Sequence, residues 1–122
     1  MSMSELKPFR WVIQRIKELA AENPDKIACC RYFGDEGAPC CIVGHVLAEA
    51  GIRPMDEDED GYYIGNDTTS VLAGTLAGQL PWEELGIEAP KTTAELRWVA
   101  EVQTRQDRGH TWGWAVEMAG DV

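Results

Sequence analysis

Positive charge is scarce in this chain of 122 residues. Lysine and arginine number 11 against 21 aspartate and glutamate residues, so the formal net charge is −10 at pH 7. Direct nucleic-acid binding needs clustered lysine and arginine to neutralise backbone phosphates, and this composition argues against it. The charge fits a protein that docks on a basic partner surface. An acidic DNA mimic is less consistent, because much of the negative excess falls in one short run.

Long apolar segments are also missing. No stretch reaches membrane-spanning length, and residues 1–9 are polar without a secretory apolar region. We therefore expect a cytoplasmic protein with no membrane association. In the reducing cytosol we expect the four cysteines, which form the adjacent pairs 29–30 and 40–41, to be free thiols and not disulfides.

The common catalytic signatures are missing too. The sequence contains no phosphate-binding glycine loop, no H-E-x-x-H motif and no nucleophile elbow. It therefore gives no direct indication of catalysis, and we interpret the chain as a binding or interaction module.

The most apolar segment, 38–51, predicts a central helix from Pro39 to Ala50. Pro39 suits the first turn of a helix, and Gly51 suits the position just after its end. The apolar residues recur at three- and four-residue spacing: Ile42, Val43, Val46, Leu47 and Ala50. A helix with so wide an apolar face belongs in the core, and Gly44 would allow a neighbouring helix to approach closely.

Three residues of this segment could carry chemistry. Cys40 and Cys41 are expected in the first helical turn, where backbone N–H groups and the helix dipole lower the pKa of a thiol. His45 follows Cys41 by four residues, on the same face. One alternative is therefore a thiol-dependent enzyme that uses Cys40 or Cys41 with His45. We favour a structural interpretation, because free cysteine is usually a small buried hydrophobe and no third catalytic group is visible nearby.

The acidic run 56–67, D-E-D-E-D-G-Y-Y-I-G-N-D, has the spacing of an EF-hand calcium loop. Glycine stands at position six, and acids stand at positions one, three, five and twelve, namely Asp56, Asp58, Asp60 and Asp67. Tyr63 replaces the usual aliphatic residue, and the closing acid is aspartate instead of glutamate. Calcium binding is therefore an alternative to a solvated charged loop, and we predict no cofactor. Zinc is disfavoured because adjacent cysteines point in different directions.

Helical spacing with start or stop signals recurs in four further segments: 8–23, 67–80, 93–107 and 112–118. Thr92 and Glu95 predict a capping box, and Thr111 predicts a cap for the last helix. We also expect a small two-stranded ribbon that pairs 26–33 with 62–64. The sequence therefore predicts a mostly α, single compact domain of about five helices over residues 1–122.

The last helix opens with the tryptophan-rich sequence G-H-T-W-G-W at 109–114. Gly113 would let Trp112 or Trp114 lie flat against a neighbour. One interpretation is a structural corner, and the other is an aromatic contact platform. We predict that Trp112 and Trp114 are the interaction residues of the module.

Two motifs, C-I-V-G-H at 41–45 and Q-D-x-G-x-T-W-G at 106–113, resemble those of an uncharacterised family of small proteins from actinobacterial phages and their hosts. The resemblance spans most of residues 26–118. It implies a cytosolic accessory protein made during infection to act on a host component, with a host protein as partner. It also implies that the central helix and the C-terminal segment form one structural unit. The acidic run lies outside the shared pattern.

Overall fold

The computed structural model describes residues 6–27, 32, 39–52, 55–57, 59–61, 63–65 and 77–122. Its α-helices are α1 (Phe9–Glu22), α2 (Ile42–Glu49), α4 (Thr93–Asp107) and α5 (Trp112–Ala119). Two 3-10 helices, η1 (Ala77–Gln79) and η2 (Trp82–Leu85), precede α4, and two short strands are β1 (Met55–Glu57) and β2 (Tyr63–Gly65). The prediction of a mostly helical small single domain is confirmed.

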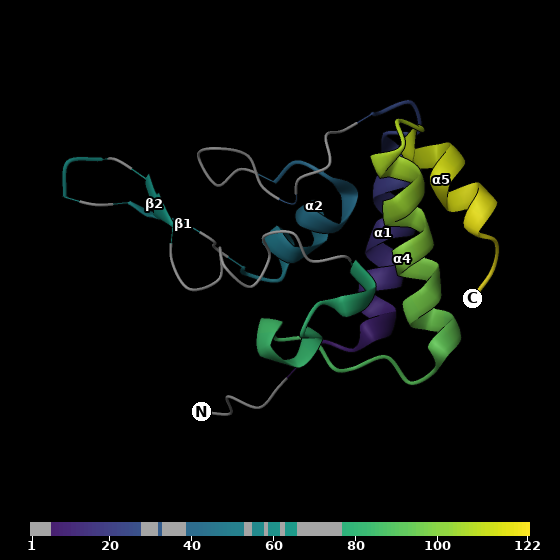
Figure 1. The fold of residues 1–122 in the computed structure, drawn as a ribbon, viewed down its shortest axis with the longest axis horizontal. Coiled ribbons are helices and arrows are strands. Elements are labelled where there is room, and N and C mark those ends of the chain that lie inside the picture. The colour runs from purple at the N-terminus through teal and green to yellow at the C-terminus, as the bar shows by residue number, and fades with distance from the viewer. Residues whose placement is uncertain are drawn as a thin grey trace.

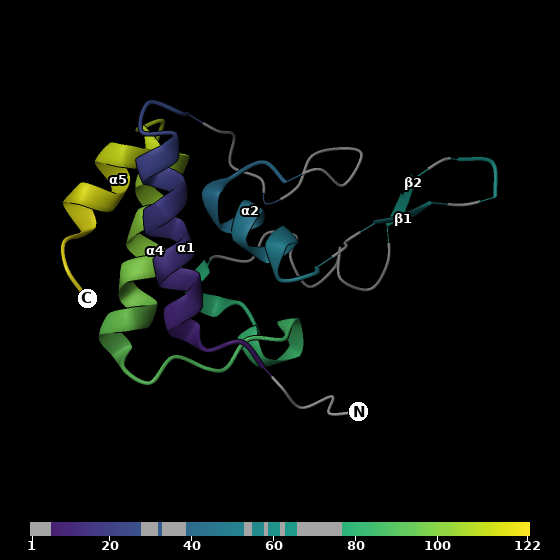
Figure 2. The same cartoon turned by 180° about the vertical axis from the view of Figure 1, so that it is seen from behind.

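Helices α1 and α4 lie side by side through the middle of the molecule (Figure 1). Helix α5 packs on one side of this pair and α2 lies on the other, as Figure 2 shows from behind. The buried residues of α1 follow the predicted stripe: Phe9, Val12, Ile13, Ile16, Leu19 and Ala20. The helix begins directly after Pro8, and its cap Asn23 stands just before Pro24, because the residue before proline is disfavoured in helical conformation.

Helix α2 begins later than predicted. Cys41 is extended, with φ −82° and ψ 170°, and its sulfur accepts a hydrogen bond from the backbone N–H of Gly44 at 3.3 Å. Cys41 is therefore the N-cap, and the helix starts at Ile42 instead of Pro39. The prediction that Cys40 and Cys41 occupy the first turn is wrong, because a side-chain cap replaces one of the missing helical hydrogen bonds at this point.

The position of α2 inside the molecule is as predicted. Five of its eight residues are buried: Ile42, Val43, Gly44, Val46 and Leu47. The close approach at Gly44 occurs, but its neighbour is the backbone of Tyr32 and not another helix. A Cβ atom built at Gly44 would lie 1.8 Å from the carbonyl oxygen of Tyr32.

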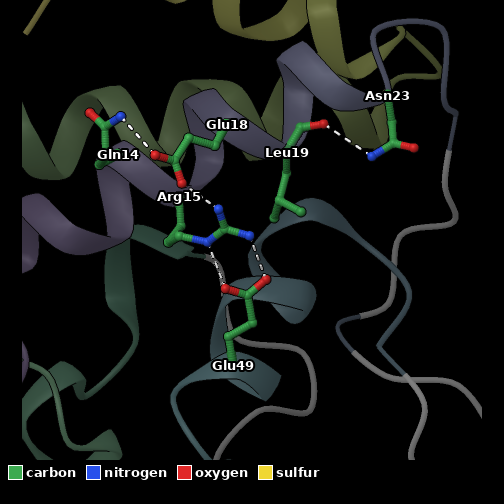
Figure 3. A network of polar contacts seen from close by, with 6 residues as sticks. All are labelled: Gln14, Arg15, Glu18, Leu19, Asn23 and Glu49. Carbon is green, nitrogen blue, oxygen red and sulfur yellow. Dashed lines mark hydrogen bonds and ion pairs between the residues drawn. The ribbon is translucent and has the colours of Figure 1, made fainter.

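An ion pair joins α1 to the far end of α2. The guanidinium of Arg15 donates from Nε and Nη2 to the two carboxylate oxygens of Glu49 at 2.6 and 2.8 Å, and its Nη1 pairs with Glu18 (Figure 3). These contacts, first with Glu49 and then with Glu18, raise the pKa of Arg15 above its usual range. A partly exposed pair such as Arg15–Glu49 contributes at most about 1 kcal/mol, so α2 is held mainly by its buried face.

Strands β1 and β2 form an antiparallel hairpin in which Asp56 pairs with Ile64. The hairpin extends away from the helices (Figures 1 and 2). A two-stranded ribbon is present, but the strand at 63–65 pairs with 55–57 and not with 26–33. The local pairing is favoured because it closes only a short loop. Of the predicted partner 26–33, Lys26 and Ile27 are not in a strand, and most of the remainder lies outside the described residues. The predicted helix 67–80 is described only from 77 onwards.

The helix signals near the C-terminus act as predicted. The hydroxyl of Thr92 accepts a hydrogen bond from the backbone N–H of Glu95 at 3.2 Å. The carboxylate of Glu95 accepts one from the backbone N–H of Thr92, also at 3.2 Å. Gly109 follows α4 with φ +93°, a conformation that favours glycine. Thr111 then caps α5 by accepting from the N–H of Trp114 at 3.2 Å. The turn between α4 and α5 is therefore specified locally.

Candidate functional site at the contact of the two motifs

The two sequence motifs meet in the core through the side chain of Gln106. Its Oε1 accepts a hydrogen bond from the backbone N–H of Ile42 at 2.6 Å and another from Nε1 of Trp112 at 3.0 Å. Gln106 and Trp112 are fully buried. One oxygen therefore joins the start of α2 to the end of α4 and the start of α5.

Trp112 is held from several directions. The ring of His45 meets it edge-on, with centroids 5.3 Å apart, and the ammonium of Lys26 lies 4.8 Å from its centroid. The backbone N–H groups of Trp112 and Gly113 donate to the carbonyl oxygens of Lys26 and Pro24 at 2.9 and 3.0 Å. Trp112 is therefore an anchor of the core, and the structure does not place it on a contact surface as we predicted.

A polar cluster continues from Gln106 along α4. The side-chain amides of Gln103 and Gln106 both donate to one carboxylate oxygen of Asp107, at 3.0 and 3.1 Å. Burial raises the pKa of Asp107. Burial also raises the pKa of the Tyr32 hydroxyl. The nearby Cys41 and Asp107 raise it further, because a negative charge on either would oppose ionisation of the hydroxyl. The one sequence signal for this cluster is helical spacing, which puts both glutamines on the same side of α4 as the buried Val99 and Val102.

Neither Cys40 nor Cys41 has the accessible thiolate that the enzyme alternative needs. Cys41 is fully buried, and burial raises the pKa of its thiol to about 11, so the thiol is protonated at neutral pH. Its sulfur caps α2, while the ring of His45 faces Trp112. Cys40 is disulfide-bonded, so the expectation that all four cysteines are free thiols is wrong. That expectation rested on the redox compartment, which says nothing of which segments the fold brings together.

The proposed calcium ligands are only partly described. Asp56 lies in β1 and Asp60 is in the exposed turn of the hairpin, whereas Asp58 and Asp67 fall outside the described residues. The hairpin differs from the helix–loop–helix arrangement of an EF-hand. Within the described ranges, no three His, Cys, Asp or Glu side chains are grouped to hold a metal ion.

The remaining predicted site residue, Trp114, is exposed on α5. Its side chain is 41 % exposed, and Met118, one turn further on, is 52 % exposed. The ring of His110 stacks on Trp114 with centroids 4.0 Å apart and planes 27° apart. We call His110, Trp114 and Met118 the α5 outer face. Ile27, another exposed apolar residue, follows Lys26, whose carbonyl binds the start of α5.

Comparisons with protein-family models, with curated proteins and with solved structures found no match for this chain. Among the described residues, every helix is too short or too polar to cross a membrane. The site thus consists of a buried polar contact between the two motifs and an apolar outer face on α5.

The buried contact predicts a pH dependence through His45. Burial first, and Lys26 second, lower the pKa of His45, and Glu49 opposes them. The folded protein therefore holds this proton less tightly than the unfolded chain does. The free energy of unfolding should fall as pH drops below about 6.5, the pKa of an unperturbed histidine. In urea denaturation between pH 7.5 and 5, His45→Phe should reduce this fall.

Removing the other histidine is the matched control. His110→Phe should keep the wild-type decrease, because His110 is exposed and lies outside the buried contact of Gln106, Trp112 and His45. An equal pH dependence of His45→Phe and the wild-type protein would show that His45 is not responsible.

Proposed function

We propose that this protein is a small acidic accessory protein of phage type that acts in the host cytoplasm as a protein-interaction module, without catalysis. The α5 outer face is its contact surface. The observation that supports this proposal is the exposure of Trp114. Trp112, two residues earlier, is buried in the core. The first turn of α5 therefore holds Trp112 inside and leaves Trp114 exposed to solvent.

The partner that fits this face is a host protein with a basic surface around an apolar contact. Glu117 and Asp121 are exposed on or just after α5, and the whole chain carries a net charge of −10. An arginine of the partner can stack on the indole of Trp114 and pair with these carboxylates. Met118 adds a flexible apolar side chain that adapts to a partner surface. The charge also speeds encounter with a basic partner.

Neither alternative gains support from the described residues. The thiol-dependent enzyme needs an accessible thiolate, and Cys41 is buried and protonated while Cys40 is disulfide-bonded. The calcium site needs oxygens arranged around one centre, and its described residues lie in a hairpin. The interaction module is therefore the stronger proposal.

Substitution of Trp114 tests the proposal. The protein is immobilised and used to capture proteins from actinobacterial lysate, and the captured protein is identified and its affinity measured. Trp114→Ser should weaken binding about 30-fold, the loss of an aromatic interface residue worth about 2 kcal/mol. The captured protein should be basic, and its binding should weaken with added salt.

Ile27→Ser is the matched control, because it also removes an exposed apolar side chain but lies outside the α5 outer face. It should change the affinity less than about twofold. If Trp114→Ser binds the captured protein as tightly as the wild-type chain does, the proposed contact surface is wrong.

A further inference from the structure

Helix α4 carries a positively charged hollow on the side away from the core. The hollow has a volume of about 260 Å³ and is lined by Arg97, Ala100, Glu101, Thr104, Arg105 and Arg108. These positions recur at three- and four-residue spacing, so they share one face of the helix. The opposite face contains the buried Trp98, Val102 and Gln106. Three arginines and one glutamate give this hollow a formal charge of +2 in a strongly acidic chain.

Most other cations near the helices already have an intramolecular role. Arg10 and Arg15 pair with carboxylates, and the lysines at 7, 17 and 26 lie over tryptophan rings. In the hollow, Arg105 is held by Glu101 at 3.2 Å. Arg97 and Arg108 form no ion pair or side-chain hydrogen bond in the part of the chain that the structure describes. Two guanidinium groups are therefore available to a ligand.

Helix stability accounts for only part of this arrangement, namely the favourable i,i+4 pair of Glu101 and Arg105. Arg105 and Arg108 are like charges three residues apart on one helix face, a pair that destabilises a helix. The helix dipole favours cations near the C-terminus, which offsets this repulsion for Arg105 and Arg108. It does not favour Arg97, which lies in the second turn of α4. Glu101 stands four residues after Arg97 but is held by Arg105, so the guanidinium of Arg97 stays free for a ligand.

We propose that this hollow binds a short chain of linked phosphates, free or carried on a nucleotide. The guanidinium fork matches phosphate oxygens, and separate arginines along the helix suit successive phosphates. Arg108 contacts one end of the chain and Arg97 contacts the other, while Arg105 stays paired with Glu101. Glu101 faces the hollow but is neutralised by Arg105, and the hydroxyl of Thr104 is placed to donate to a phosphate oxygen. This site is separate from the α5 outer face.

Calorimetric titration with tripolyphosphate at physiological ionic strength tests this proposal. Arg97→Gln and Arg108→Gln should each weaken binding about tenfold, and both variants should fold because neither side chain has a partner to lose. Lys91→Gln is the matched control: it removes the same charge from an exposed residue just before α4 and should change the affinity less than about twofold.

A parallel titration with ATP distinguishes the two sources of phosphate. Tighter binding of ATP than of tripolyphosphate assigns the chain of phosphates to a nucleotide, and equal or weaker binding assigns it to a free oligophosphate. Either result supports the site. No binding at millimolar tripolyphosphate, or an equal loss of affinity in Lys91→Gln, overturns it.

Discussion

Replacing Gly44 with alanine should destabilise the protein by at least about 3 kcal/mol, although alanine is the better helix former by about 1 kcal/mol. The added methyl carbon would stand 1.8 Å from the carbonyl oxygen of Tyr32. That oxygen also accepts the backbone N–H of Cys40 at 2.9 Å, so moving it would disturb the chain that leads into α2. The clash is with backbone, which has little freedom to move aside.

Two other glycines on helices provide a graded comparison. A methyl group at Gly113 would lie 2.9 Å from the carbonyl oxygen of Pro24, and one at Gly78 would lie 3.4 Å from the Cβ atom of Ala100. The loss of stability should therefore be greatest for Gly44→Ala, smaller for Gly113→Ala and within about 1 kcal/mol for Gly78→Ala. Urea denaturation followed by circular dichroism measures all three.

The order of the three losses in stability distinguishes a steric clash from an effect of helix propensity. If helix propensity governed these positions, Gly44→Ala would be neutral or stabilising. That result would mean that the backbone of Tyr32 does not lie against α2 at Gly44.

The elements with complete local signals could be predicted from the sequence. Helix α1 has a regular apolar stripe and a proline near each end. Helix α4 has a capping box, and its end is marked by Gly109. These signals act between residues close in sequence, so they need no knowledge of the fold.

The start of α2 and the roles of the two tryptophans could not be predicted in this way. Capping rules favour oxygen side chains, so the sulfur of Cys41 gave no signal, and Pro39 marked the start instead. Trp112 and Trp114 stand in a short, mostly apolar helix in which Glu117 is the one charged residue. Which one is buried depends on Gln106, His45 and Lys26, which come from other parts of the chain.

In the candidate site too, local features could be predicted from the sequence and tertiary contacts could not. The resemblance led us to expect that the central helix and the C-terminal segment form one unit, and the structure joins them through Gln106. Helical spacing puts Gln106 on the same side of α4 as the buried Val99 and Val102, but the identity of its hydrogen-bond donors required the tertiary structure. A buried amide is informative in a sequence because it needs partners, and the sequence alone does not name them.

Replacing Gln106 with methionine should destabilise the protein by about 3 kcal/mol. The volume is nearly kept, but the backbone N–H of Ile42 and the indole N–H of Trp112 both lose their acceptor. A buried donor without a partner costs about 1–3 kcal/mol, and two are left here. Gln14→Met, an exposed substitution of the same kind on α1, should change stability by less than about 0.5 kcal/mol.

A double-mutant cycle isolates the bond between Gln106 and Trp112. Trp112→Phe keeps most of the aromatic volume and removes the indole donor, so Gln106→Met should be less harmful in that background by about 1 kcal/mol. The remaining loss then belongs mainly to the N–H of Ile42 at the start of α2. Equal losses in both backgrounds would mean that the two side chains do not interact. A negligible loss in the single variant would remove Gln106 as the link between the helices.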